Sequence, residues 1–150
     1  MVRTLAPYSG NIKKRLIKAP KVFIRDSGIL HTLLNIETME DLFAHPIYGA
    51  SYEGYVIENI VTHLPRWQAS YYRTANGAEI DLLLAKGMKK IAVEIKSSTS
   101  PKVSKSFWNS IETVAPDQTV VIAPVEEPYP IADQVMVMPL HAVFKAECRM

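Results

Sequence analysis

The stretch NGAEIDLLLAKGMKKIAVEIKSS, residues 76–98, decides the fold of this 150-residue chain. It predicts two β-strands, residues 78–85 and 90–96, joined by a tight turn at Gly87 and Met88. A two-residue loop at this turn fixes the register, so that the numbers of paired residues sum to 175. Most strand residues are apolar, and the exceptions that require an explanation are Glu79, Asp81, Glu94 and Lys96, because charge inside a sheet is costly.

In this register Asp81 lies directly opposite Glu94, and Glu79 lies opposite Lys96. Opposed side chains in such a pair have Cβ atoms about 4.5–5.5 Å apart. A cross-strand ion pair explains Glu79 and Lys96. Two opposed carboxylates repel each other, however, and they require a shared proton, nearby cations or a bound metal. Oxygen ligands at this spacing suit Mg²⁺ or Mn²⁺. The other face of the hairpin is predicted to be apolar, with Ile80, Leu82, Leu84, Ile91, Val93 and Ile95.

The preceding segment, residues 51–64, has the apolar period of a helix, which Pro65 ends. On a helical projection Glu53 falls in the middle of the apolar stripe, where a carboxylate is improbable without a partner. Glu58 falls outside the stripe and is interpreted as a solvated surface acid. The stripe consists of Ile57, Ile60, Val61 and Leu64, with Val56 beside it.

The pair Asn76-Gly77 is a strong signal for a second two-residue hairpin turn. This turn would place Tyr72 opposite Asp81, on the charged face of the sheet. Tyr71 and Arg73 would then lie on the other face.

The remaining pattern predicts an α/β domain at residues 49–150, with a mixed sheet flanked by helices. Residues 1–48 are interpreted as a smaller unit that packs onto this domain or exchanges with a second chain in a homodimer. A proline-rich segment, residues 123–130, is predicted to be a surface loop. Further strands are predicted at residues 21–24, 69–74, 119–123 and 135–138, and further helices at 27–35, 37–44, 104–114 and 140–145.

Composition excludes several classes of protein. The single cysteine, Cys148, precludes an internal disulfide, and no CxxC motif or His/Cys cluster indicates zinc. The sequence has no P-loop motif, so no nucleotide site of that type is expected. The absence of a signal peptide and of a membrane-spanning run favours a soluble cytoplasmic protein. The net charge of +2 decides nothing about partners.

The set formed by Glu53, Asp81 and Glu94-Ile95-Lys96 resembles the active site of the PD-(D/E)XK nuclease superfamily. In that pattern an acid of the first helix joins an Asp on one strand and E-x-K on the next. The segment GASYE, residues 49–53, also looks like the start of archaeal Holliday-junction resolvases. Ile80 stands where the superfamily usually has a proline. The resemblance implies a restriction-endonuclease-like core: a helix, a three-stranded meander, a helix and further strands.

A wider resemblance covers nearly the whole chain. It is carried by APYSGNIKKRLIKAPKVFIRDSGILHTLL (residues 6–34), HPIYGASYEGYVIENI (45–60), YYRTANGAEIDLLL (71–84) and AVEIKSS (92–98). These segments look like an uncharacterised domain found behind an AAA-type ATPase domain in many prokaryotic proteins. The resemblance implies that residues 1–48 are the remnant of a winged-helix-like linker and that the ATPase part is missing.

These resemblances imply metal-dependent hydrolysis of DNA. Asp81, Glu94 and the carbonyl of Ile95 would hold Mg²⁺ or Mn²⁺. Lys96 would position or activate the attacking water, and Glu53 would bind a second ion or the water shell of the first. Two alternatives stay open: a non-catalytic DNA-binding or partner-docking module, and a structural domain with internal ion pairs. Residues interpreted either as contacts to the DNA backbone or as a solvated surface are Lys13, Lys14, Arg15, Lys102 and Lys105.

Overall fold

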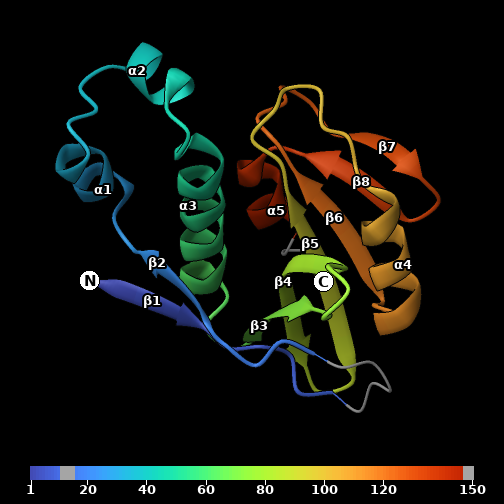
Figure 1. Ribbon diagram of the computed structural model, residues 1–150. Coiled ribbons are helices and arrows are strands. Elements are labelled where there is room, and N and C mark those ends of the chain that lie inside the picture. Colours follow the sequence, from blue (N-terminus) through green and yellow to red (C-terminus); the bar gives the residue numbers. More distant parts are fainter. Residues whose placement is uncertain (11–15, 147–150) are drawn as a thin grey trace.

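A computed structural model, which describes residues 1–10 and 16–146, shows a six-stranded mixed sheet with helices on both faces (Figure 1). The strand order across the sheet is β3-β4-β5-β6-β8-β7. Strand β6 runs parallel to β5 and to β8, and the other neighbours are antiparallel. The predicted α/β class with a mixed sheet is therefore confirmed. The strands are β3 (Gln68–Arg73), β4 (Glu79–Lys86), β5 (Lys89–Ile95), β6 (Gln118–Ile122), β7 (Tyr129–Ala132) and β8 (Val135–Met138).

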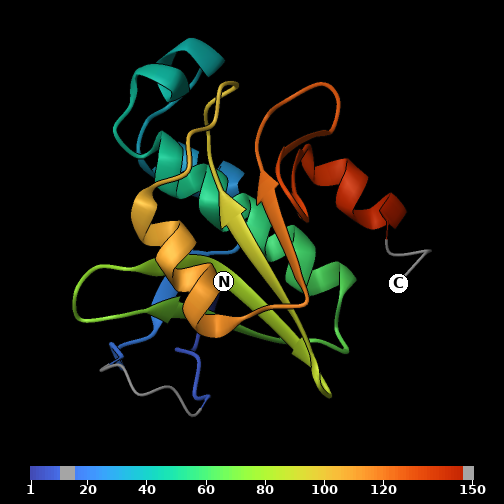
Figure 2. The same ribbon diagram turned by 90° about the vertical axis from the view of Figure 1, so that its right-hand side faces the viewer.

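Helices form the outer two of three layers, as Figures 1 and 2 show. Helix α3 (Tyr48–His63) and α5 (Leu140–Ala146) lie against one face of the sheet, and α4 (Lys105–Val114) lies against the other. The stripe predicted for α3 is buried in the core, since Val56, Ile57 and Ile60 are each 0% exposed. Burial of one such side chain contributes about 1.5–3 kcal/mol, so this stripe fixes the rotation of α3. Glu53, on the same helix, is thereby turned toward the sheet.

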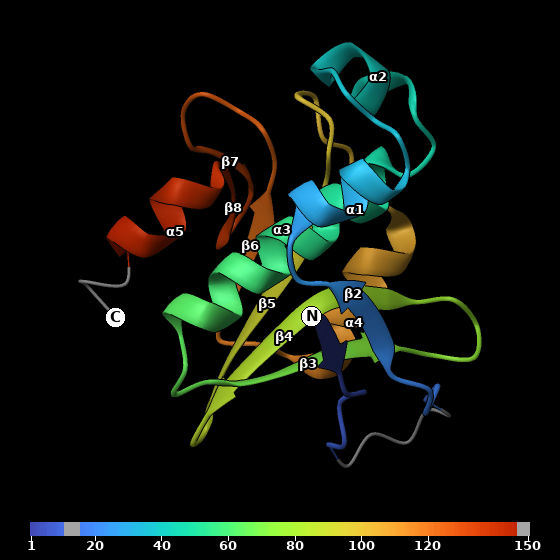
Figure 3. The same ribbon diagram turned by 90° about the vertical axis from the view of Figure 1, so that its left-hand side faces the viewer.

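The N-terminal segment forms a two-stranded ribbon, β1 (Val2–Leu5) and β2 (Lys21–Ile24), followed by α1 (Ser27–Leu33) and α2 (Met39–Ala44). In Figure 3 the ribbon and α1 lie beside α3. Leu5 is 2% exposed and belongs to the same core cluster as α3. The backbone N–H of Tyr8 donates to the Tyr71 carbonyl, and the N–H of Tyr71 donates to the Ala6 carbonyl. Within one chain, the segment therefore packs against the sheet domain.

Contacts of Glu58 and Gly54 are among those that hold the ribbon on α3. The carboxylate of Glu58 accepts hydrogen bonds from the Arg3 and Arg25 guanidinium groups, one on β1 and one directly after β2. Gly54 lies under Phe23 of β2, and a Cβ atom there would come within 3.2 Å of the Phe23 ring. The interpretation of Glu58 as a solvated surface acid was wrong, because helical phase cannot reveal a ribbon that covers this side of α3.

The predicted elements agree with the structure to within a few residues, with two exceptions. Strand β1 has too weak a pattern to be recognised in the sequence. Strand β7 falls partly in the segment predicted to be a surface loop, and it contains Pro130. All four of its residues are exposed at the edge of the sheet, where proline costs no ladder hydrogen bond.

Candidate functional site

The hairpin of β4 and β5 has the predicted register. Its ladder runs from Leu82 opposite Val93 to Lys86 opposite Lys89, and each pair sums to 175. Asp81 and Glu94 lie one step beyond the last described pair. There the side chain of Asp81 accepts a hydrogen bond of 2.8 Å from the backbone N–H of Ile95. The carboxylate thus bonds to β5 where the described backbone ladder has ended.

The pairing of β3 with β4 differs from the prediction. Tyr72 lies opposite Ile80 and not opposite Asp81, because a register shift separates it from Ser70. The loop also closes over three residues, with the Thr74 N–H bonded to the Ala78 carbonyl. Tyr72 is 0% exposed and packs in an apolar cluster with Val114 of α4, so it is not on the charged face.

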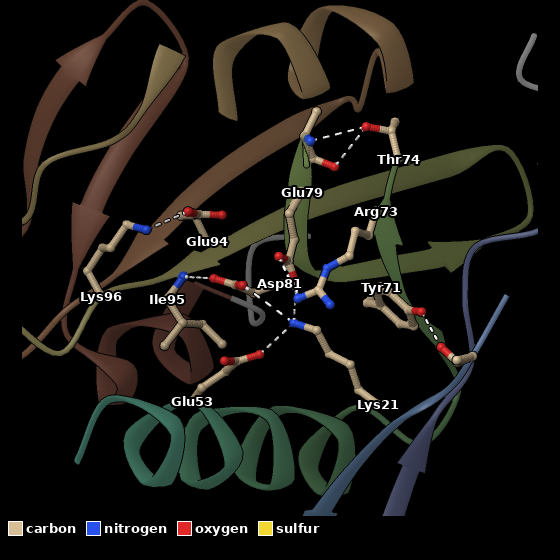
Figure 4. Close-up of polar contacts among 12 residues, drawn as sticks. Lys21, Glu53, Tyr71, Arg73, Thr74, Glu79, Asp81, Glu94, Ile95 and Lys96 are labelled. Atoms are coloured by element: carbon tan, nitrogen blue, oxygen red, sulfur yellow. Dashed lines mark hydrogen bonds and ion pairs between the residues drawn. The ribbon is translucent and has the colours of Figure 1, made fainter. Parts of the chain in front are cut away.

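The alternation of side chains along β4 also breaks at this point. Ile80 packs in the cluster on the α4 side, whereas Leu82 packs in the cluster on the α3 side. The prediction that Ile80 shares a face with Leu82 was therefore wrong. Asp81 lies between Ile80 and Leu82, where the alternation of side chains between the two faces is interrupted. This irregularity directs the Asp81 carboxylate toward α3 and the end of β5 (Figure 4).

The predicted ion pair between Glu79 and Lys96 is also absent from the described contacts. Glu79 instead pairs with Arg73, its cross-strand neighbour on β3, at 2.7 Å, and with Lys21. Lys96, directly after β5, has its Nζ 2.7 Å from Oε1 of Glu94, two residues earlier in the chain. The prediction failed because it extended a regular hairpin past the end of its ladder.

Lys21, the first residue of β2, lies in the middle of the acids. Its Nζ is 2.8 Å from Oε1 of Glu53 and 3.7 Å from Oδ1 of Asp81, besides its contact with Glu79. Only 13% of the lysine side chain is exposed. Burial lowers the pKa of Lys21, but the surrounding carboxylates more than offset this effect and raise the pKa above its ordinary value. The ammonium group therefore stays charged.

Glu94 is the most buried of the candidate acids, with 6% of the residue exposed. Its Oε1 accepts the hydrogen bond from Lys96, but its buried Oε2 has no hydrogen-bond partner among the described residues. Burial and the nearby charge of Asp81 raise the pKa of Glu94 to about 7. A buried carboxylate oxygen without a partner is costly unless a proton or a cation reaches it.

The other two acids are perturbed in the same direction. Burial raises the pKa of Asp81, although the Ile95 N–H and the charge of Lys21 oppose the increase. Burial and the charge of Asp81 raise the pKa of Glu53, although Lys21 opposes this effect. In all three carboxylates burial is the main cause of the raised pKa, and perturbed acids of this kind are typical of functional sites.

Four of the predicted catalytic and metal-binding residues lie in one region of the fold, as Figure 4 shows. Asp81 lies near the start of β4, Glu94 near the end of β5 and Glu53 on the adjacent helix α3, with Lys96 on one side of these acids and Lys21 on the other. Lys21 and Arg73 were missed in the sequence. No local signal marks Lys21, because it enters the site through the packing of a distant ribbon.

The remaining candidates do not join this cluster. Lys102 and Lys105 are exposed, close to the start of α4. Lys13, Lys14 and Arg15 lie outside the described residues. Across residues 1–10 and 16–146, no group of three or more His, Cys, Asp or Glu residues is arranged closely enough to hold a metal ion. In the same part of the chain, no helix is both long and apolar enough to cross a membrane.

Comparisons with known proteins identify two matching families. The profile of a domain of unknown function, DUF4143, matches residues 48–143, and that of a second one, DUF8612, matches residues 1–40. Two curated relatives are the uncharacterized proteins Rv2008c of Mycobacterium tuberculosis and Mb2031c of Mycobacterium bovis. Each is 34% identical over 139 residues, which cover 93% of this chain and 32% of the relative. The chain thus spans about a third of the length of these relatives.

Proposed function

The chain belongs to the family of the domain of unknown function DUF4143, and we propose that it is a metal-dependent DNA endonuclease of the PD-(D/E)XK type. One observation carries the proposal: Oε2 of Glu94 is buried without a hydrogen-bond partner among the described residues, while Oε1 is held by Lys96 and the nearby charge of Asp81 raises the pKa of Glu94. The order of the elements α3, β3, β4, β5, α4 and β6 also follows the core expected for this superfamily.

The donor atoms fit a hard divalent cation. Carboxylate and carbonyl oxygens are the ligands that Mg²⁺ and Mn²⁺ prefer, and Asp81, Glu94 and the Ile95 carbonyl would supply them. Four carboxylates, with Glu79 included, face the cationic groups of Lys21, Arg73 and Lys96, so the ionised cluster has a formal charge of −1. A divalent cation would change this formal charge from −1 to +1 and give Glu94 Oε2 a partner.

When bound, the metal ion would polarise a phosphate oxygen and lower the pKa of a water molecule. The residues of the chain then have distinct tasks. The hydrogen bond from the Ile95 N–H holds Asp81 in place for the ion. Lys96 would orient the attacking water and offset the charge that develops on the phosphate. Exposed Lys102 and Lys105 are candidates for contacts to the DNA backbone, and such contacts would be independent of base sequence.

The second candidate function is a non-catalytic DNA-binding or partner-docking module. The position of Lys21 favours it, because this ammonium group already contacts Glu53 and Glu79 and lies near Asp81. An acid cluster neutralised by its own lysine side chains would be stable without metal. The two candidates differ in one property: only the endonuclease requires a divalent cation at Asp81 and Glu94.

A cleavage assay on duplex, flap and four-way DNA, with and without Mg²⁺ or Mn²⁺, tests the proposal. We expect metal-dependent cleavage that Asp81→Asn reduces by a factor on the order of 10²–10³. The exposed Asp133, changed to Asn, is the matched control and should leave cleavage unchanged. DNA binding without cleavage of any of the three substrates would favour the non-catalytic module.

A further inference from the structure

Lys21 has an anchored position and is not a mobile surface lysine. It lies opposite Leu5 in the β1–β2 ribbon, and Leu5 is buried in the main core. The hydroxyl of Tyr71 donates a hydrogen bond to the Ala19 carbonyl, two residues before Lys21. The Tyr71 ring lies below the ammonium group, with its centroid 5.4 Å from Nζ. The backbone and the aliphatic part of the side chain are therefore held in place, and the charge projects into the acid cluster (Figure 4).

The contacts of Lys21 divide the acid cluster into two parts. Its Nζ contacts Glu53 and Glu79 most closely, and it is 3.7 Å from Oδ1 of Asp81. The other oxygen of Asp81 faces β5, where it accepts the Ile95 N–H. The unpartnered oxygen, Oε2 of Glu94, belongs to the second part. Lys21 occupies the first part, whereas in the second part Lys96 binds only Oε1 of Glu94 and leaves Oε2 without a partner among the described residues.

We propose that Lys21 replaces a second metal ion, so that the site holds a single divalent cation between Asp81 and Glu94. The inference rests on the proposed metal site, and it assigns Glu53 to Lys21 and not to a metal. A lysine ammonium group is compact and has three N–H donors, enough for Glu53, Glu79 and Asp81. A second divalent ion beside Glu53 would have to displace this charge, because like charges at contact distance repel each other strongly in a partly buried site.

Lys21 also connects the two separately matched segments of the chain. Lys21 lies in the segment matched over residues 1–40, whereas Glu53, Asp81 and Glu94 lie in the segment matched over 48–143. The first segment therefore contributes a positioning residue to a site that the second segment builds. Without Lys21, the acids near Glu53 would lack the cation that they now share.

Counting bound Mn²⁺ tests the proposal without any activity measurement. Calorimetric titration and electron paramagnetic resonance should give one Mn²⁺ per wild-type chain and two per chain of Lys21→Gln or Lys21→Met. The matched control is Lys18→Gln, an exposed lysine of the same segment, which should still bind one ion. If wild type and both Lys21 variants each bind one ion with equal affinity, the inference fails and the proposed metal site stands. If neither wild type nor the variants bind Mn²⁺, the proposed metal-dependent function itself fails.

A second measurement needs no variant, in case the loss of Lys21 prevents folding. Crystals of the wild-type protein grown with Mn²⁺ should show one anomalous peak, between Asp81 and Glu94, with Nζ of Lys21 still on Glu53. Two peaks, or one peak at Glu53 with Lys21 displaced, would overturn the inference.

Discussion

Asp81 on β4 accepts a 2.8 Å hydrogen bond from the backbone N–H of Ile95 on β5. Ile95 stands between Glu94 and Lys96, so this one bond fixes the carboxylate of Asp81 relative to both neighbours. It is formed where the described ladder between the two strands has ended at Leu82 and Val93. The side chain thus replaces a backbone partner at the point where the strands part, and this allows a charged group to occupy the interior of a sheet.

Mn²⁺ should stabilise the wild-type fold. A ligand that binds only the folded state contributes about 2.7 kcal/mol at a hundredfold excess over its dissociation constant. For a chain of this size that corresponds to an increase in Tm of roughly 5–10 °C. Thermal melts with increasing Mn²⁺ measure the shift, and Glu94→Gln should abolish most of it. An unchanged Tm of the wild type at millimolar Mn²⁺ would contradict the metal site.

The metal-free protein should lose stability as the pH rises from about 4.5 to about 7. The folded-state pKa of Glu94 is raised from 4.5 to about 7, so the folded state retains a proton that the unfolded state has released. The contribution of this proton to the free energy of unfolding is fully present below pH 4.5 and is lost as the pH rises through 7. Urea unfolding at a series of pH values should show a smaller decrease for Glu94→Gln. The exposed Glu126, changed to Gln, should leave the slope as in the wild type.

The sequence was sufficient to predict the sheet class and the register of the β4–β5 hairpin, and it singled out Glu53, Asp81, Glu94 and Lys96, which Figure 4 shows in one region of the fold. All of these follow from local periodicity and from one turn, and both are properties of neighbouring residues. The charged pairs of Glu79 and Lys96 were predicted wrongly because a regular ladder was assumed to continue past Leu82. A break in the alternation of side chains along a strand cannot be predicted from periodicity, because the periodic pattern is interrupted at that point.

The contribution of Lys21 could not be predicted from the sequence for a different reason. Lys21 is separated from Glu53 by 32 residues, and its approach depends on how the β1–β2 ribbon packs over α3. That packing depends on Gly54, which admits Phe23, and on Glu58, which binds two arginines. Such long-range contacts become visible only in three dimensions.

Glu58 should contribute to stability at neutral pH. Its hydrogen bond with Arg3 lowers the pKa of the Glu58 carboxyl to about 2. A carboxyl group whose pKa is lowered in the folded state stabilises the fold at pH values above its pKa in the unfolded state, about 4.5. This stabilisation is lost as the pH falls through 2. We expect Glu58→Gln to cost about 1.5–3 kcal/mol at pH 7 and progressively less toward pH 2.

Urea unfolding of both proteins between pH 7 and pH 2 measures this difference. Glu112→Gln, on the exposed side of α4, is the control and should change little at any pH. A Glu58 variant as stable as the wild type at pH 7 would show that the other contacts of the ribbon hold it in place without the ion pairs of Glu58.

Asp81→Asn should abolish Mn²⁺ binding while leaving the metal-free protein as stable as the wild type, or more stable. Burial raises the pKa of Asp81, which means that the folded protein disfavours its charged form. The asparagine side chain still has a carbonyl oxygen that can accept the Ile95 N–H. The substitution therefore keeps the hydrogen bond and removes the repulsion with Glu94 and Glu53. Lys21 retains its contacts with Glu53 and Glu79.

A purely structural ion-pair network predicts the opposite result. Breaking a satisfied buried pair costs about 3–5 kcal/mol, because the remaining charge is left without compensation. Urea unfolding of the metal-free wild type and of Asp81→Asn separates the two cases, and Mn²⁺ titration of the same samples reports binding. A loss of that size without metal would mean that Asp81 serves to hold Lys21 in the fold. Unchanged or increased stability together with lost Mn²⁺ binding would mean that the carboxylate of Asp81 serves to bind the cation. In that case the carboxylate does not stabilise the metal-free fold.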